Sequence, residues 1–186
     1  MVSGEQGSTA EAALIWVDIA KGLAETATGS ATRDAARRMC AREALWDACL
    51  RWGHLMGHPL AAALLADHVA ILSAFVDAAV RRDSVSMASL LSAALQNTED
   101  QGRLYSADAP GFPGEAWKEA MVLHIARTAS YCDALCAGRM SAFTDAFAKA
   151  SEARDALAAF WMARFSVKSP SQTPGAIGEK PGTGGR

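Results

Sequence analysis

The fold of this chain is decided by two stretches, HVAILSAFVDAAV at residues 68–80 and HIARTASYCDALC at residues 124–136, which align without a gap. The alignment places His68 on His124. Further pairs of similar residues follow at the same offset: Phe75 with Tyr131, Asp77 with Asp133, Glu99 with Asp155, Leu104 with Phe160 and Tyr105 with Trp161. The sequence therefore predicts an internal duplication of one supersecondary unit.

Each copy has the pattern of a helical hairpin. Apolar residues recur at helical spacing in both copies, and neither contains the alternating run that is typical of a strand. A short break divides each copy, at residues 82–84 in the first and 138–139 in the second. The linker at 106–114 contains two prolines and two glycines and separates the copies. Two hairpins, at about residues 58–105 and 114–161, predict an all-α, up-down four-helix bundle.

Two additional N-terminal helices are expected before the duplication. Leucine, valine and isoleucine form a helical stripe in residues 11–27, and Thr28-Gly29-Ser30 is expected to end that helix. A second helix is predicted from Thr32 to about Arg51. The helices expected within the duplication span residues 60–82, 84–105, 115–137 and 141–168.

The length of 186 residues suits one domain with a single core, which we place at residues 9–168. Residues 1–8 are rich in glycine and serine and are predicted to be disordered. The tail at residues 169–186 has three prolines, five glycines and few apolar residues. Such a segment buries too little apolar surface to offset its ordering entropy, so we predict that it is disordered as well.

Charge and composition narrow the possible partners and the compartment. A formal net charge of −2 provides no basic field, so a nucleic-acid partner is not expected. The longest apolar window, residues 60–80, is interrupted by Asp67, His68 and Asp77, which indicates a buried helix and no membrane span. Four cysteines in a chain without a signal-peptide pattern indicate reduced thiols and a cytoplasmic location.

The spacing of several polar residues carries a family resemblance. The runs LLSAALQNTEDQG at residues 90–102 and EARDALAAFW at 152–161 flank the histidine stretch at residue 124. In this pattern the chain resembles a family of small bacterial all-helical proteins with a duplicated hairpin and no established activity. Residues that match the family pattern are His68, Asn97, Asp100, Gly102, His124, Asp155 and Phe160. The chain departs from it at Ala153, where an asparagine is expected. The resemblance covers residues 60–165 and implies a fold without implying an activity.

The matching polar residues form the candidate site. The two histidines, each near the start of its hairpin, are expected to face acidic residues on the paired helices. Imidazole and carboxylate together suit a divalent transition metal such as zinc, iron or manganese, and ligands of this kind converge in bundle cores. The candidate metal ligands are His68, His124, Glu99, Asp100 and Asp155.

The alternative interpretation is a structural network. The Glu-x-x-His motif of di-iron bundles is absent, since Asp67 directly precedes His68 and Met121 stands three positions before His124. A buried histidine that bonds to a carboxylate or an asparagine would satisfy two polar groups that are otherwise costly to bury. We favour this network over a metal centre, and over catalysis or ligand binding.

Two other spacings have ordinary explanations. His54 and His58 lie four residues apart, but Gly53, Gly57 and Pro59 place them in a predicted turn. A second pair, Cys132 with Cys136, is one helical turn apart and could bind Cu(I) or zinc, although small core residues are the favoured interpretation. The sequence has no P-loop, glycine-rich dinucleotide loop or Gly-x-Ser-x-Gly elbow.

Three functions remain open. The favoured one is a binding or interaction protein, expected as a homodimer that buries exposed aromatic residues. The other two are a metal-dependent protein and an enzyme that acts on a small molecule in the bundle core. The aromatic residues expected at the surface are Trp16, Trp46, Trp52, Trp117 and Trp161.

Overall fold

The computed structural model describes residues 3–109 and 111–166, so the predicted disordered tail at 169–186 lies outside the described residues. The described chain is all-helical and contains no strand, which confirms the predicted fold class. α1 begins earlier than the predicted helix at residue 11. The six helices are α1 (Ser3–Thr32), α2 (Ala35–Met56), α3 (Pro59–Arg81), α4 (Ser84–Asp108), α5 (Gly114–Cys136) and α6 (Met140–Ser166).

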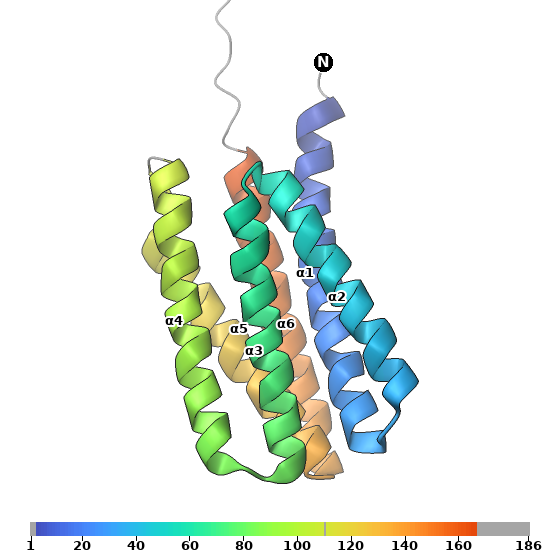
Figure 1. Cartoon of the computed structure of the whole chain (residues 1–186). Helices are drawn as coiled ribbons and strands as arrows, with labels where there is room; N and C mark the ends of the chain where they lie inside the picture. The colour runs from blue at the N-terminus through green and yellow to red at the C-terminus, as the bar shows by residue number, and fades with distance from the viewer. Residues whose placement is uncertain (1–2, 110, 167–186) are drawn as a thin grey trace, which may run out of the picture.

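The helices form one bundle with an inner and an outer set (Figure 1). The inner helices α1, α3 and α5 all contact one another. Each outer helix packs against two of them: α2 against α1 and α3, α4 against α3 and α5, and α6 against α5 and α1. The expected four-helix bundle with two additional helices is not confirmed in this detail, because α1 is an inner helix.

The predicted break at Thr28-Gly29-Ser30 is wrong, since α1 continues to Thr32. Gly29 serves a close helix contact instead: a Cβ at this position would lie 2.7 Å from Cγ of Arg38 on α2. The chain turns afterwards, where Arg33 adopts a left-handed φ of 59°. Asp34 then caps α2 by accepting a hydrogen bond from the Arg37 amide at 3.0 Å.

The helix ends predicted at Gly57, Pro59 and Gly138 are confirmed. The turn predicted to begin at Gly53 is wrong, because α2 continues to Met56, and α4 extends to Asp108, into the predicted linker at 106–114. Gly57 ends α2 with a φ of 66°, and Gly138 follows α5 with a φ of 68°, conformations that glycine adopts without steric cost. Pro59 occupies the start of α3, where a missing N–H costs nothing. Asp83 caps α4 and accepts a hydrogen bond from the Ser86 amide at 3.0 Å.

Four of the five tryptophans lie in the core, so the prediction that they are exposed is wrong. Trp16, Trp52, Trp117 and Trp161 are each at most 1% exposed. They meet where α2, α4 and α6 end and α5 begins, with the rings of Trp52 and Trp161 only 4.7 Å apart. A core enclosed by six helices is larger than that of the predicted four-helix bundle, and these rings fill it. Trp46 alone is exposed, at 59%.

Among the described residues, α3 is the one helix long and apolar enough to cross a membrane, judged by length and composition. In this fold α3 is an inner helix in contact with α1, α2, α4 and α5. Its buried residues include Leu65, Leu72 and Val76. The apolar composition of α3 is therefore explained by its position in the core.

Candidate functional site

The two histidines of the duplicated pattern meet in the core. His68 on α3 is fully buried, and His124 on α5 is 2% exposed. Their ring centroids are 5.8 Å apart. The ring of Trp16 on α1 packs edge-on against His124 at 5.7 Å. The three inner helices thus each contribute one ring to the centre of the bundle.

Both imidazoles are neutral and lack hydrogen-bond partners. Burial lowers the pKa of His68 to about 3, helped by the nearby His124 and opposed by the Asn97 side chain. Burial alone lowers the pKa of His124 to about 4. By geometry no ring nitrogen of either histidine forms a hydrogen bond, although the Asn97 side chain is close enough to His68 to oppose the fall in its pKa as a hydrogen-bonding neighbour. A neutral imidazole offers one donor and one acceptor, and a buried polar group left unpaired costs roughly 1–3 kcal/mol.

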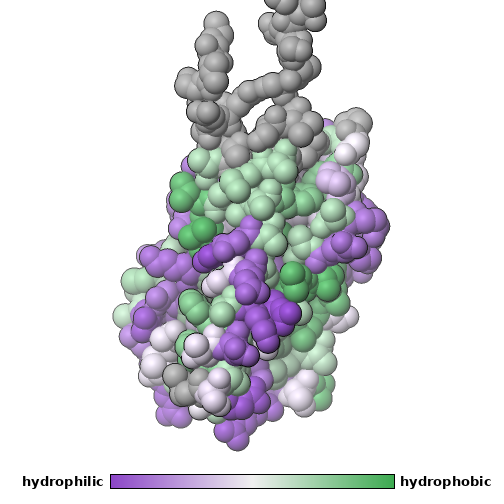
Figure 2. Space-filling view, turned by 180° about the vertical axis from the view of Figure 1, so that it is seen from behind, coloured by the Kyte–Doolittle hydropathy of each residue, from purple (hydrophilic) through white to green (hydrophobic). Residues whose placement is uncertain are grey.

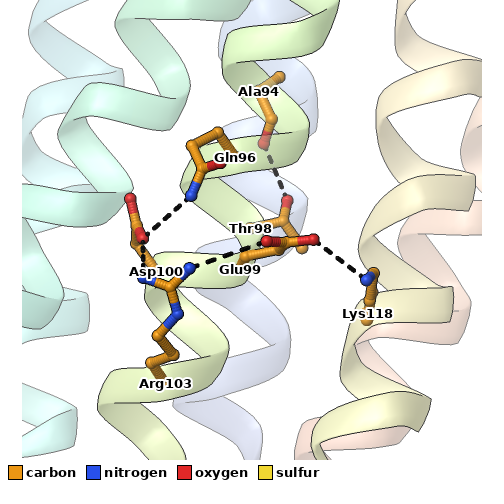
Figure 3. Close-up of polar contacts among 7 residues, drawn as sticks. All are labelled: Ala94, Gln96, Thr98, Glu99, Asp100, Arg103 and Lys118. Atoms are coloured by element: carbon orange, nitrogen blue, oxygen red, sulfur yellow. Dashed lines mark hydrogen bonds and ion pairs between the residues drawn. The ribbon is translucent and has the colours of Figure 1, made fainter.

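Two of the predicted acidic ligands point away from the histidines. Figure 3 shows Glu99 and Asp100 on the outer side of α4, each beside a basic side chain. Glu99 accepts a hydrogen bond from Lys118 at 3.1 Å, and Asp100 accepts one from Arg103 at 3.0 Å. Successive residues of a helix are rotated by about 100°. Because Asn97 faces inward, Glu99 two positions later faces outward, whereas Asp100, three positions later, lies at the edge of the inner side and is half-buried.

The third predicted acid, Asp155, is also exposed and accepts hydrogen bonds from Arg154 at 2.8 and 2.6 Å. The five predicted ligands therefore do not come together. Within residues 3–109 and 111–166, no group of three or more His, Cys, Asp or Glu side chains is arranged to hold a metal ion. Two imidazoles are too few donors for a site of the predicted type.

The predicted hydrogen bonds between the histidines and carboxylates are also absent from the described residues. The sequence analysis missed a different buried feature on α4, a chain of side-chain hydrogen bonds that we call the polar ladder. Trp52 Nε1 donates to the Tyr105 hydroxyl at 2.9 Å, which donates to Gln101 Oε1 at 3.3 Å. Gln101 Nε2 donates to Asn97 Oδ1 at 2.7 Å, and Asn97 Nδ2 donates to the Leu64 carbonyl at 3.0 Å. Asn97, Gln101 and Tyr105 are spaced four residues apart, which is the signal that could have revealed this ladder.

A pocket of about 420 Å³ opens between α1, α5 and α6, and His124 is one of its lining residues. Figure 2 views the molecule from the side on which α5 and α6 lie, where apolar residues gather in the upper half and the lower half mixes polar and apolar residues. Apolar residues that line the pocket include Val17, Leu23 and Phe147. Its polar lining residues are Lys21, Glu25, Thr28, His124, Thr128, Tyr131, Ser151 and Arg154.

Two other pockets have different linings. The pocket between α1 and α2, about 380 Å³, is lined by paired charges, with Arg37 bound to Glu25 and Arg51 bound to Asp18. The pocket between α2 and α3, about 570 Å³, is larger and is lined by His54 and His58. His54 lies in the last turn of α2 and not in a loop, whereas His58 caps α3. Neither pocket contains a buried imidazole without a partner.

The cysteines differ in burial: Cys136 is partly buried and Cys40 is exposed. Cys49 and Cys132 are buried, and all four cysteines are free. Burial raises the pKa of Cys49 to about 12, that of Cys136 to about 11 and that of Cys132 further still. The thiols of Cys132 and Cys136 are therefore protonated at neutral pH, and both side chains pack in one apolar core cluster.

Comparison with known proteins gives no further guide, because the chain matches no protein-family model, no curated protein and no solved structure.

Proposed function

We propose that this protein is a binding protein that holds a small organic molecule in the pocket between α1, α5 and α6. One observation carries the proposal: His124, buried and without a hydrogen-bond partner, lines that pocket. A ligand atom that bonds to this imidazole would remove a cost of roughly 1–3 kcal/mol from the folded protein. The pocket volume of about 420 Å³ also lies within the range of known ligand sites.

The site favours binding over catalysis. A histidine that acts as a general base is commonly oriented by a carboxylate, as in hydrolase triads. Here Glu25 is the carboxylate of the pocket lining, and it pairs with Arg37 on α2. His124 is thus a neutral hydrogen-bonding group in an apolar setting, an arrangement suited to recognition.

The proposal also includes three expectations from the sequence: the internal duplication, the family likeness and the cytoplasmic location. The duplication of residues 58–105 and 114–161 is supported by α3 and α5, which are both 23 residues long and bring the paired histidines within 5.8 Å. The likeness to the family of small bacterial helical proteins depends on the same residues. A cytoplasmic location remains part of the proposal, on the expectation from the sequence that the four cysteines stay reduced.

We also propose a homodimer, now supported by one exposed stripe on α2. Met39, Trp46 and Leu50 lie on one face of this helix and are all exposed. Light scattering at micromolar concentration should give twice the chain mass, and Trp46→Gln should give a monomer. Val85→Gln, at an exposed position on α4, is the control and should leave the dimer intact. A monomeric wild type would contradict the proposal.

Ligand-observed NMR with a library of metabolite-sized fragments tests the binding function. We expect hits for the wild type that Ala150→Phe abolishes, because this substitution fills the pocket from α6 while keeping His124. Trp46→Gln, in the pocket between α2 and α3, is the control and should keep the hits. Circular dichroism verifies the fold of each variant. Hits that survive Ala150→Phe would place binding elsewhere and overturn the proposal.

A further inference from the structure

The charges and polar groups that line the pocket between α1, α5 and α6 differ between its mouth and its floor, and this difference points to one class of ligand. We propose, building on the proposed binding function, that the ligand is a small apolar monocarboxylate with a neutral hydroxyl or carbonyl group at its other end. The carboxylate lies near Lys21 and Arg154, and the neutral group bonds to His124.

The mouth of the pocket has a cation that no protein carboxylate neutralises. Lys21 is exposed, makes no ion pair among the described residues, and lines both this pocket and the one between α1 and α2. It is near enough to Glu25 to contribute slightly to the lowered pKa of that carboxyl group, but the main cause is the hydrogen bond from Arg37. Glu25 is therefore already paired, and Lys21 is left to bind an anion.

Arg154 adds a second positive group from α6. Its guanidinium binds one carboxylate oxygen of Asp155 through both Nε and Nη2. This leaves its other terminal nitrogen, Nη1, without a hydrogen bond to that carboxylate. A carboxylate ligand between α1 and α6 would thus find an ammonium group on one wall and guanidinium donors on the other.

The floor of the pocket is polar but neutral. His124 and Thr128 are buried on α5. Tyr131, one turn farther along, has its pKa raised to about 12 by burial, so its hydroxyl stays protonated. A charged ligand group placed here would lose its hydration without gaining an opposite charge. A hydroxyl or carbonyl group would instead satisfy the imidazole at little cost.

The walls between mouth and floor are apolar. Three apolar side chains of the lining are Leu23, which is buried, and Val17 and Phe147, which are exposed. These side chains require an apolar body between the two polar ends of the ligand. A pocket of about 420 Å³ holds a molecule with on the order of ten non-hydrogen atoms.

Three related compounds test this class by isothermal titration calorimetry. The probe 4-hydroxyphenylacetate has both polar ends, 2-(4-hydroxyphenyl)ethanol lacks the carboxylate, and phenylacetate lacks the hydroxyl. We expect the wild type to bind the first at least about tenfold more tightly than either of the others.

Two variants test which residue recognises the carboxylate and which recognises the hydroxyl of the ligand. Lys21→Met should remove most of the preference for the acid over the alcohol, and His124→Phe should remove the preference for the hydroxylated acid over phenylacetate. Lys118→Met, which deletes the same charge from an exposed position outside the pocket, should change neither preference.

Equal affinity for acid and alcohol, equal effects of Lys21→Met and Lys118→Met, or no binding of 4-hydroxyphenylacetate would each overturn the assigned ligand class. If 4-hydroxyphenylacetate does not bind while neutral fragments bind and are lost in Ala150→Phe, the binding function stands and this ligand class is ruled out. The absence of any fragment that depends on the pocket would overturn both.

Discussion

His68 and His124 are bases held in the neutral form, because burial outweighs the interaction that favours the protonated form of His68. Each pKa in the folded protein, about 3 and about 4, lies below the value of 6.5 for an unperturbed histidine. The unfolded chain therefore binds more protons than the folded one as the pH falls below that value. The two residues therefore impose no ionisation penalty on the fold above pH 6.5, and a growing penalty lowers its stability as the pH falls below that value.

This linkage predicts how stability depends on pH. Urea unfolding of the wild type should show a falling free energy of unfolding between pH 7 and 5, with a slope that approaches two protons. His124→Phe should reduce that slope by about one proton, since the substitution removes one of the two bases. An unchanged slope in this variant would show that other groups cause the pH dependence.

The same two residues allow a direct test of the metal alternative. We expect a chelator to leave the melting temperature of the wild type unchanged, because two buried imidazoles without an acidic neighbour form an incomplete ligand set. His68→Ala should cost about 1–3 kcal/mol, with or without added zinc, iron or manganese. A rise in melting temperature with one metal, lost in both His68→Ala and His124→Ala, would contradict this.

At the scale of single elements, α4 places opposite chemistry on its two sides. Its inner side carries Asn97, Gln101 and Tyr105, joined by hydrogen bonds, and its outer side carries Glu99 in an ion pair with α5. Exposed ion pairs of the latter kind contribute little to stability. A buried ladder matters more, because removing one member leaves its neighbours unpaired.

Gln101→Leu should accordingly destabilise the protein by about 1–3 kcal/mol, since Asn97 loses its donor and Tyr105 loses its acceptor. Gln96→Leu is the matched control on the exposed side of the same helix and should change stability by less than about 0.5 kcal/mol. Denaturant unfolding measures both. Equal effects of the two substitutions would mean that the ladder is not a stabilising unit.

Local signals predicted the helix ends well, and tertiary contacts explain the failures. Asp83, Gly57 and Pro59 act through their own backbone or an adjacent turn, so their positions could be read from sequence. Gly29 could not, because it is needed for contact with a helix that the local sequence does not identify.

The candidate site was predicted in part for a related reason. The offset of the duplication identified His68 and His124 as core partners, and the structure places them together. Spacing along the chain did not fix the rotation of α4 about its axis, which decides whether Asn97 or Glu99 faces inward. It also gave no sign of α1 beside them, and α1 supplies Trp16 and one wall of the pocket.

For the whole molecule, the decisive feature is that α1 belongs to the inner set of helices. Its buried residues include Ile15, Trp16 and Ile19, which pack in the same core as residues from the duplicated unit. Trp16 contacts Trp52, Trp117 and His124 with ring centroids between 5.7 and 6.1 Å apart. Removing α1 would therefore expose core residues at the centre of the bundle to solvent.

This predicts that a fragment of residues 57–166, which keeps both copies of the duplicated hairpin, does not fold cooperatively alone. Losing α1 and α2 removes Trp16 and Trp52 from the core, a loss larger than the 3–5 kcal/mol that one tryptophan-to-alanine change typically costs. Thermal unfolding followed by circular dichroism should show no sharp transition for the fragment and a sharp one for residues 1–166. A cooperative transition in the fragment would instead establish the four-helix unit as an independent domain, with α1 and α2 as additions to it.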